Sequence, residues 1–478
     1  MPEGCCSAEG RGSAGFDLAI LGGGSAAFAA ARTATQRGAR VLLANEGPIG
    51  GTCVNVGCVP SKTLIRAAEN HRAHGLVRFR GLEAEPGRVD FAELAREKDA
   101  LVEQLRQAKY LDVLAGLPGV QRIHGRGRLV GPHELEVAGT VYHADKLLIA
   151  TGTRPARPPV PGLEDPEVWD STGALAATRL PRRLVVLGGR YVALELGQMF
   201  ARLGSRVTVV QRSAQILPDE DADLAEALAD LLREEGIDVR TGCEIHRVSR
   251  ESEGFQVVVR REGRKERLSA DAVLAALGRT PNSDGLGVET LGLALESGGF
   301  VKVGDDLQTS VPGIYAAGDV IGEPAYVYAA AYEGSLAAEN ALGGTARARD
   351  YTALPWVIFT DPQVAGVGVN ERQAEAAGIE VDVSLLPLSQ VPRALAARDT
   401  RGFVKLLRAR GEDRLVGARI LAPEGSEQIM EASLLVKYGL PISETAHHFH
   451  PYLTQSEAIK LALLGFDTDV AALSCCAS

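Results

Sequence analysis

The stretch FDLAILGGGSAA, residues 16–27, decides the fold of this chain. Its first six residues are mostly apolar and predict a buried strand, and the alanine-rich residues after the glycines predict a helix. The glycines follow the pattern G-x-G-x-x-A, which lets the backbone approach a pyrophosphate at a helix N-terminus. A second strand, Val41 to Ala44, ends near an acid that is placed to receive a ribose hydroxyl. The pattern predicts a dinucleotide-binding unit with these ligand-binding residues: Gly22, Gly24, Ala27 and Glu46.

The chain repeats this unit. An apolar strand at Leu184–Leu187 runs into Gly188-Gly189-Arg190-Tyr191-Val192-Ala193, which opens a second helix. Aligning the two copies places Arg212 where the first has Glu46. An arginine holds a 2'-phosphate that an acid would repel, so we expect the first site to take an adenosine with free ribose hydroxyls and the second to take NADPH. Arg190 replaces the middle glycine, and its guanidinium is suited to contact a phosphate.

Two cysteines follow the first unit in GTCVNVGCVPSK, residues 51–62. We interpret Cys53 and Cys58 as a redox-active thiol pair, because Pro60 suits a helix start whose dipole favours a thiolate. A structural disulfide and half of a zinc site are the alternatives. A zinc site needs two further ligands at matching spacing, and no second cysteine pair or cysteine–histidine pair lies near in the sequence.

Other segments give weaker signals. Residues 91–114 predict an amphipathic helix with Tyr110 near its end, and in isolation this tyrosine is expected to serve packing. The proline-rich segment 154–161 predicts a domain linker. A buried strand ends on Gly318-Asp319, which suits a carboxylate that binds a sugar or ribityl hydroxyl. From about residue 350 the chain mixes strands and helices without a nucleotide signature, which predicts a third domain.

Composition limits the function classes. The chain has 478 residues and a net charge of -10, and its densest basic run, residues 260–267, is interrupted by glutamates, so we expect no nucleic-acid partner. The first 15 residues contain no apolar segment of the kind that directs secretion. The longest nearly apolar run, residues 18–31, is too short for a membrane span and is broken by glycines. We therefore expect a cytoplasmic protein without a membrane span. Three histidines at 447, 448 and 450 leave a metal site as an alternative, although their spacing is not a usual zinc pattern.

From about Phe16 onward, the chain resembles the FAD-dependent pyridine nucleotide-disulfide oxidoreductases. The motifs above come in that family's order. The resemblance implies an α/β fold with two Rossmann-like dinucleotide-binding domains, one inserted in the other, plus a C-terminal α+β dimerisation domain. It predicts these domains: a flexible leader at 1–15, an FAD-binding domain at 16–155 and 280–349, an NADPH-binding domain at 156–279, and the dimerisation domain at 350–478.

The resemblance also implies roles for individual residues. Cys53 and Cys58 would form the redox-active disulfide, with Cys58 next to the flavin. Lys62, paired with Glu195, would place a cation near the reactive edge of the flavin. Further expected contacts are, for FAD, Thr52, Lys62, Thr151, Gly152, Gly318 and Asp319, and, for NADPH, Gly188, Arg190, Tyr191, Arg212 and Gly278.

Within that family, the tail resembles that of the members that reduce mercury. Cys475 and Cys476 are adjacent near the C-terminus, and Tyr110 and Tyr452 lie where those members carry active-site tyrosines. Hg(II) is soft and favours thiolates, so a terminal pair supplied by the partner subunit would pass the ion inward by ligand exchange. Cys53, Cys58, Cys475 and Cys476 are thus the expected Hg(II) ligands. The expected function is NADPH-dependent reduction of a thiolate complex of Hg(II) to Hg(0) by a homodimer.

Two other functions stay open. Disulfide reductases of the family carry a His-Pro pair with a glutamate five residues after the histidine. Here His450 is present, but the fifth position is Gln455, and Glu457 lies two residues later. The alternative from another class is a protein that sequesters soft metals without turnover. We expect a catalytic core without the N-terminal metal-binding domain usual in mercury-reducing members. We interpret Cys5-Cys6 as incidental thiols, and a rudimentary ion-collecting pair is the alternative.

Overall fold

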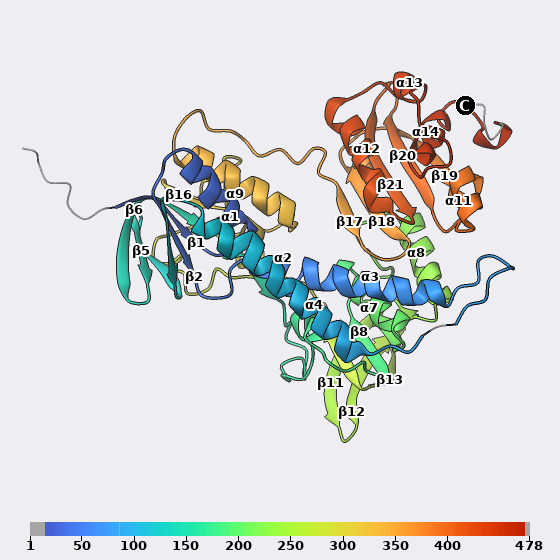
Figure 1. Ribbon diagram of the computed structural model, residues 1–478, viewed down its shortest axis with the longest axis horizontal. Coiled ribbons are helices and arrows are strands. Elements are labelled where there is room, and N and C mark those ends of the chain that lie inside the picture. Colours follow the sequence, from blue (N-terminus) through green and yellow to red (C-terminus); the bar gives the residue numbers. More distant parts are fainter. Residues whose placement is uncertain (1–14, 86, 474–478) are drawn as a thin grey trace, which may run out of the picture. The chain divides into compact units, whose positions relative to one another are not determined.

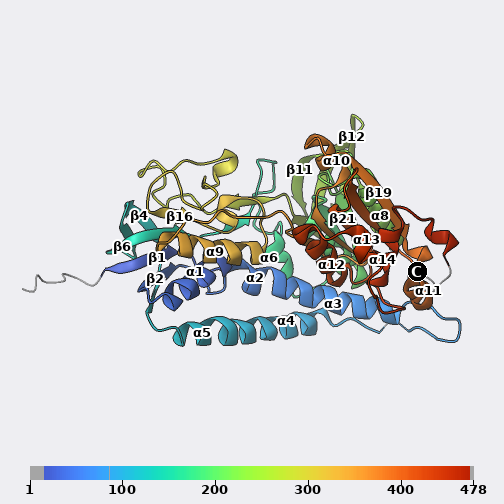
Figure 2. The same cartoon turned by 90° about the horizontal axis from the view of Figure 1, so that it is seen from above.

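The structure, a computed structural model, describes residues 15–85 and 87–473 (Figures 1 and 2). Its contacts divide the chain into two compact units, each discontinuous in sequence. The first comprises the described residues up to Val59 together with Asp99–Pro155 and Gly278–Arg349. The second comprises Pro60–Lys98, Ala156–Leu277 and the described residues from Asp350. Among the described residues, no helix is both long and apolar enough to cross a bilayer.

A seven-stranded sheet forms the base of the first unit, in the order β3-β2-β1-β6-β5-β4 with β16 paired to β6. Its strands are β1 Phe16–Leu21, β2 Val41–Asn45, β3 Val120–His124, β4 Gly127–Gly131, β5 Glu134–Val137, β6 Thr140–Ile149 and β16 Ile314–Ala316. Strand β1 lies between β2 and β6 and is parallel to both, with Leu18 opposite Val41 and Lys146. The predicted Rossmann-like fold is confirmed here, because the apolar run of β1 is buried in the middle of the parallel part.

Helices α1 (Ser25–Gln36) and α9 (Val327–Ala341) lie side by side in this unit (Figures 1 and 2). The buried face of α1 consists of alanines, and together with β1, β2 and β6 it forms one apolar core. A Cβ atom on Gly334 of α9 would lie 2.1 Å from the Ala26 carbonyl oxygen. The small residues therefore let the two helices approach closely.

The helices that carry Cys53, Cys58 and Tyr110 differ from the expectation in two details. After α2 (Gly51–Val56), helix α3 (Cys58–His74) begins at Cys58, two residues before Pro60. Proline is tolerated there because the first-turn N–H groups of a helix have no intrahelical partner. Residues 91–114 do not form one regular helix: α4 (Phe91–Arg106) passes into a π-helical turn, η1 (Gln107–Leu111), and then α5 (Asp112–Ala115).

The second unit contains the predicted repeat. Its parallel sheet has the order β10-β9-β8-β14, and an antiparallel hairpin sheet has the order β11-β12-β13. The strands are β8 Arg183–Leu187, β9 Arg206–Val210, β10 Asp238–Arg240, β11 Cys243–Glu251, β12 Gly254–Arg261, β13 Arg264–Ala270 and β14 Ala272–Ala275. The helices of this region are α6 Ser171–Leu175, α7 Tyr191–Arg202 and α8 Ala222–Glu234. The first residues of the predicted linker instead form a short strand in the first unit, β7 (Thr153–Pro155), which pairs with β15 (Arg279–Pro281).

The C-terminal part of the second unit is an α+β domain. Its antiparallel sheet has the order β17-β18-β21-β20-β19. The strands are β17 Trp356–Ile358, β18 Gln363–Gly368, β19 Val381–Pro387, β20 Phe403–Ala409 and β21 Leu415–Ala422. Its helices are α10 Glu371–Ala376, α11 Pro392–Ala397, α12 Gly425–Tyr438, α13 Ile442–Thr445 and α14 Glu457–Leu464. Helix α12 packs on β18 and β21, and α14 packs on β19 and β20, which encloses one apolar core (Figure 1).

Candidate active site

The first glycine-rich turn joins β1 to α1 in a shape that only glycine allows. Gly22 has φ +139°, and a Cβ atom there would lie 2.1 Å from the Ala150 carbonyl oxygen. Gly24 is the N-cap of α1, and a Cβ atom on Gly51 would lie 2.6 Å from the Gly24 Cα. Any side chain would fill this cradle, so the backbone N–H groups at the start of α1 fit the pyrophosphate of a dinucleotide.

The carboxyl ends of the parallel strands supply the other expected contacts in this unit. Glu46 follows β2 directly and is exposed. Beyond β6, Thr151 Oγ1 donates to the Asn282 carbonyl oxygen at 2.8 Å, which fixes the Thr151-Gly152 turn. Ligands of open α/β sheets bind at this edge. The expected residues therefore lie at the edge of the sheet where this fold binds ligands.

Asp319 lies at the end of the same sheet edge. Its Oδ2 accepts a hydrogen bond from Thr153 Oγ1 at 3.0 Å and lies 3.8 Å from Arg279 Nε. Gly318 has φ +78°, and its N–H donates to Glu333 Oε2 at 2.6 Å. Glu333 is only 1% exposed and was not anticipated, because no motif marks it. This buried carboxylate fixes the turn that positions Asp319.

Cys53 and Cys58 are held by glycine-rich backbone. Cys53 is in α2, Cys58 is the first residue of α3, and both are half-buried. A Cβ atom on Gly57, between them, would lie 2.9 Å from the Thr52 carbonyl oxygen. The 17 residues of α3 direct the positive end of the helix dipole toward Cys58. This environment favours a negatively charged sulfur at that position.

Tyr110 lies beside this cysteine pair. Burial raises the pKa of its hydroxyl, negative charge on Cys53 and Cys58 raises it further, and a hydrogen bond with Ser25 opposes the shift. Its ring packs edge-on against Phe28, with the ring centroids 5.1 Å apart. π-Helical turns such as the one that carries Tyr110 occur often at functional sites. The first unit thus brings Tyr110 together with both cysteines and with the start of α1.

Lys62 and Glu195 form an ion pair within the second unit. Lys62 Nζ lies 2.6 Å from Glu195 Oε2, and Glu195 is buried. Glu195 Oε1 accepts a hydrogen bond from the Phe359 backbone N–H at 2.9 Å, and Lys62 Nζ lies 4.8 Å from the centre of the Phe359 ring. The pairing that the resemblance implied is present. Phe359 was missed because an isolated aromatic residue carries no sequence signal.

The second glycine-rich turn repeats the geometry of the first. Gly188 has φ +120°, and a Cβ atom there would lie 2.3 Å from the Ala276 carbonyl oxygen. Arg190 is the N-cap of α7, and Arg212 lies exposed just after β9. Tyr191 stacks on Trp356 with the ring planes 9° apart. In the first unit, Gly278 adopts φ +109°.

His450 has a carboxylate partner that the sequence pattern did not indicate. Its Nε2 lies 2.6 Å from Glu431 Oε1 on α12, whereas Glu457 accepts the N–H of Leu453. His447 Nδ1 instead contacts the Ser443 carbonyl oxygen. Within residues 15–85 and 87–473, no cluster of three or more histidines, cysteines or carboxylates is arranged to hold a metal ion.

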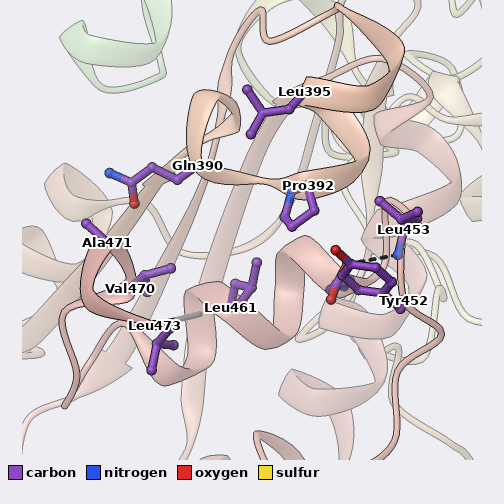
Figure 3. A pocket seen from close by; sticks show the side chains of 10 residues that line it. Gln390, Pro392, Leu395, Tyr452, Leu453, Leu461, Val470, Ala471 and Leu473 are labelled. Atoms are coloured by element: carbon purple, nitrogen blue, oxygen red, sulfur yellow. Dashed lines mark hydrogen bonds between the residues drawn. The ribbon is translucent and has the colours of Figure 1, made fainter. Parts of the chain in front are cut away.

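Tyr452 lines a pocket of about 490 Å³ in the second unit (Figure 3). Pro392 and Leu395 of α11 and Leu461 of α14 form part of its wall, and Leu473 lies at its edge. Cys475 and Cys476, like Cys5 and Cys6, lie outside the residues that the structure describes.

Comparison with known proteins identifies the class. Residues 16–334 match the family model described as pyridine nucleotide-disulphide oxidoreductase, and residues 354–463 match the model of that family's dimerisation domain. The chain belongs to the pyridine nucleotide-disulphide oxidoreductase family and is an oxidoreductase. The resemblance inferred from the motifs and the predicted fold class are confirmed.

Within that family, the chain is similar to curated mercuric reductases. The chain is 45% identical to the Streptomyces lividans mercuric reductase over 97% of this chain and 98% of the relative. It is 42% identical to the Staphylococcus aureus mercuric reductase over 97% of this chain and 84% of the relative.

Solved structures share the fold. The Cu(II) complex of the HOCl-induced flavoprotein disulfide reductase RclA from Escherichia coli aligns with a TM-score of 0.84 at 32% identity, over 95% of this chain and 99% of that chain. LpdA from Mycobacterium tuberculosis aligns with a TM-score of 0.83 at 29% identity, over 94% of this chain and 98% of that chain.

Proposed function

We propose that this protein reduces Hg(II) to Hg(0) with NADPH, through bound FAD and the Cys53/Cys58 pair. The observation that carries the proposal is the grouping of Tyr110 with both cysteines beside the first glycine-rich turn. It occurs in a chain that is 42% and 45% identical to two curated mercuric reductases. The reaction balances as NADPH plus Hg(II) giving NADP⁺, a proton and Hg(0).

The residues of the first unit fit FAD as the resident cofactor. The cradle at Gly22 and Gly24, the acid Glu46 and the Gly318-Asp319 turn would hold its pyrophosphate, ribose and ribityl groups. When bound, FAD supplies two-electron transfer between NADPH and the cysteine pair. The Lys62–Glu195 ion pair would position a cation for this chemistry, with the buried carboxylate holding the lysine in one orientation.

The cysteine pair would bind the mercury ion. Thiolates are the preferred ligands of a soft metal ion, and the N-terminus of α3 favours the charged form of Cys58. The Tyr110 phenol would donate a hydrogen bond to a thiolate, and burial together with the negative charge on the cysteines raises its pKa, which disfavours its competing as an anionic ligand. Tyr110 is therefore assigned to orient the inner thiolates.

Ion delivery and assembly belong to the same proposal. Cys475 and Cys476 would capture Hg(II) from external thiols and pass it inward from the partner subunit, with Tyr452 flanking the path. The dimerisation domain supports a homodimer, and the exposed side chains of Met430, Leu434 and Tyr438 along α12 offer an apolar surface for it. Because NADPH is the reductant, we place the reaction in the cytoplasm.

The test uses the purified yellow protein in excess thiol. We expect Hg(II)-dependent oxidation of NADPH accompanied by loss of volatile mercury, and loss of both in Cys53→Ala and Cys58→Ala. Cys243→Ala is the matched control, because Cys243 is buried in another domain. Turnover of glutathione disulfide or lipoamide with none of Hg(II) would contradict the proposal. Stoichiometric binding without NADPH consumption would indicate sequestration.

The terminal cysteines need a separate test. We expect the double substitution Cys475→Ala and Cys476→Ala to slow Hg(II) turnover under strong competition from added thiol. Reduction of the bound flavin by NADPH should be unchanged. Unaltered turnover under that competition would remove the tail from the pathway.

One observation favours a second candidate function, reduction of small disulfides. His450 has its carboxylate partner in Glu431, so a histidine–carboxylate pair exists despite Gln455. Such a pair is suited to move a proton to or from an organic thiol.

A further inference from the structure

A carboxylate lies against the arginine of the second glycine-rich turn. Asp219 Oδ1 lies 3.2 Å from Arg190 Nη2, and Asp219 Oδ2 contacts Arg190 Nη1. Arg190 is the N-cap of α7, the helix end at which the pyrophosphate of a dinucleotide is bound in this fold. Asp219 and a bound pyrophosphate would therefore compete for the same guanidinium group.

Asp219 is held in place by a buried polar network. Its carbonyl oxygen accepts a hydrogen bond from Asn370 Nδ2 at 2.9 Å. The next residue, Glu220, lies 2.5 Å from Arg419 Nε, and Arg419 is only 1% exposed. Removing one partner of such a buried pair is strongly unfavourable. The backbone that carries Asp219 is thus fixed.

The same segment is tied to the turn itself. The N–H of Leu217 donates to the Gly189 carbonyl oxygen at 2.9 Å. Asp221, on the other side of Asp219, lies 3.2 Å from the fully buried Lys405 Nζ. The contact between Asp219 and Arg190 is therefore a property of the folded domain and not of a loop free to move away.

The ion pair is weak even though its support is rigid. The side chains of Arg190 and Asp219 are 56% and 63% exposed. Exposed pairs of this kind contribute about 0–1 kcal/mol. A pyrophosphate carries two negative charges and also interacts with the N-terminus of α7, so it can take Arg190 from Asp219. The cost of breaking the pair is then subtracted from the binding free energy of the dinucleotide.

We propose that Asp219 sets the affinity of the second site for dinucleotides by competing with their pyrophosphate for Arg190. The inference rests on the proposed function only in taking NADPH as the reductant. Because NADH and NADPH share the pyrophosphate, the pair acts equally on both. The choice between them is made elsewhere, at Arg212 just after β9, where a 2'-phosphate would lie.

The experiment measures binding of NADP⁺ and NAD⁺ to the flavoprotein by titration calorimetry, without Hg(II). We expect Asp219→Asn to lower both Kd values by about threefold to fivefold, and Arg190→Ala to raise both by about tenfold. In the Arg190→Ala background, Asp219→Asn should change either Kd by less than about twofold, because the competition has gone.

Two control variants separate this role from others. Asp271→Asn removes the carboxylate of another arginine–aspartate pair, which Arg183 forms at the other end of β8 with 2.7 Å between the two groups, and should leave both Kd values within about twofold. Arg212→Ala should weaken NADP⁺ alone. A thermal midpoint of Asp219→Asn equal to that of the parent protein shows that the fold is intact, and Asp219→Ser provides a second substitution.

Three results would overturn the inference. They are unchanged Kd values in Asp219→Asn, a change for NADP⁺ only, or an effect of Asp219→Asn that persists without Arg190. Because no arm uses Hg(II), a failure of mercury reduction leaves these results interpretable. Conversely, binding results that contradict the role of Asp219 do not affect the interpretation of the mercury assay.

Discussion

His450 Nε2 lies 2.6 Å from Glu431 Oε1, and that carboxylate belongs to α12, 19 residues before the histidine. The other ring nitrogen, Nδ1, lies 3.1 Å from the His448 carbonyl oxygen. Both ring nitrogens therefore face oxygen atoms, which fixes the orientation of the imidazole ring. The histidine–carboxylate pair therefore uses Glu431, which no local sequence pattern identifies.

Glu431→Gln tests whether this pair handles protons for organic thiols. We expect glutathione disulfide turnover to fall by about tenfold or more, because the amide cannot hold the imidazolium, while Hg(II)-dependent NADPH oxidation stays within about twofold. Glu427→Gln, an exposed glutamate of the same helix, is the control. A parent protein without disulfide turnover would exclude the second candidate function, and an equal loss of mercury turnover would place the pair in the main pathway.

Glu195→Gln should separate the charge of the buried carboxylate from its shape. The amide oxygen still accepts the Phe359 N–H, but Lys62 loses its counter-charge. We expect the rate at which NADPH reduces the bound flavin to fall by about tenfold, and the free energy of unfolding to fall by about 1–3 kcal/mol. Rapid-mixing absorbance and urea unfolding measure the two effects. Lys437→Met, which removes an exposed ion pair with Asp350, should change neither by a comparable amount.

Gly22→Ala and Gly38→Ala form a matched pair for the flavin site. Both glycines have positive φ, so both substitutions strain the backbone. Only at Gly22 would the new Cβ meet backbone, 2.1 Å from the Ala150 carbonyl oxygen, whereas nothing lies within 4 Å of it at Gly38. We expect Gly22→Ala to be purified without yellow colour and Gly38→Ala to keep its flavin with a modestly lower thermal midpoint. Full flavin content in Gly22→Ala would show that this turn does not cradle the cofactor.

Sequence reasoning succeeded where the determinants are local. A strand, a glycine turn and a helix form within about 20 residues, so both dinucleotide units were predictable from local sequence. The Lys62–Glu195 pairing joins residues 133 apart, and only the family resemblance pointed to it.

The missed features depend on tertiary packing. Asp219, Glu333 and Glu431 are ordinary acids in the sequence, and each acquires a role only when another element is brought against it. The π-helical turn at Tyr110 follows a helical pattern that does not distinguish it from α-helix. Domain boundaries and the roles of the terminal cysteines stay predictions.

Glu69 on α3 gives a pH-dependent prediction for stability. Burial raises its pKa to about 6 from the ordinary 4.5, and Arg66, whose Nη1 lies 2.8 Å from Oε2, opposes the shift only partly. The folded protein thus binds this proton more tightly than the unfolded chain, so the stabilisation is complete below about pH 4.5 and is lost as the pH rises through about 6. Screening of this partly solvated group limits the effect to about 1 kcal/mol.

Glu69→Gln should remove that pH dependence, because the amide stays neutral at every pH. We expect the variant to equal the parent near pH 4.5 and to exceed it by about 1 kcal/mol in free energy of unfolding at pH 8, measured by urea unfolding at several pH values. Glu83→Gln makes the same change at an exposed site of the second unit, and it should not alter the free energy of unfolding at either pH. A constant difference between Glu69→Gln and the parent across this range would mean that lost contacts with Arg66, and not the burial of the carboxylate, determine the effect.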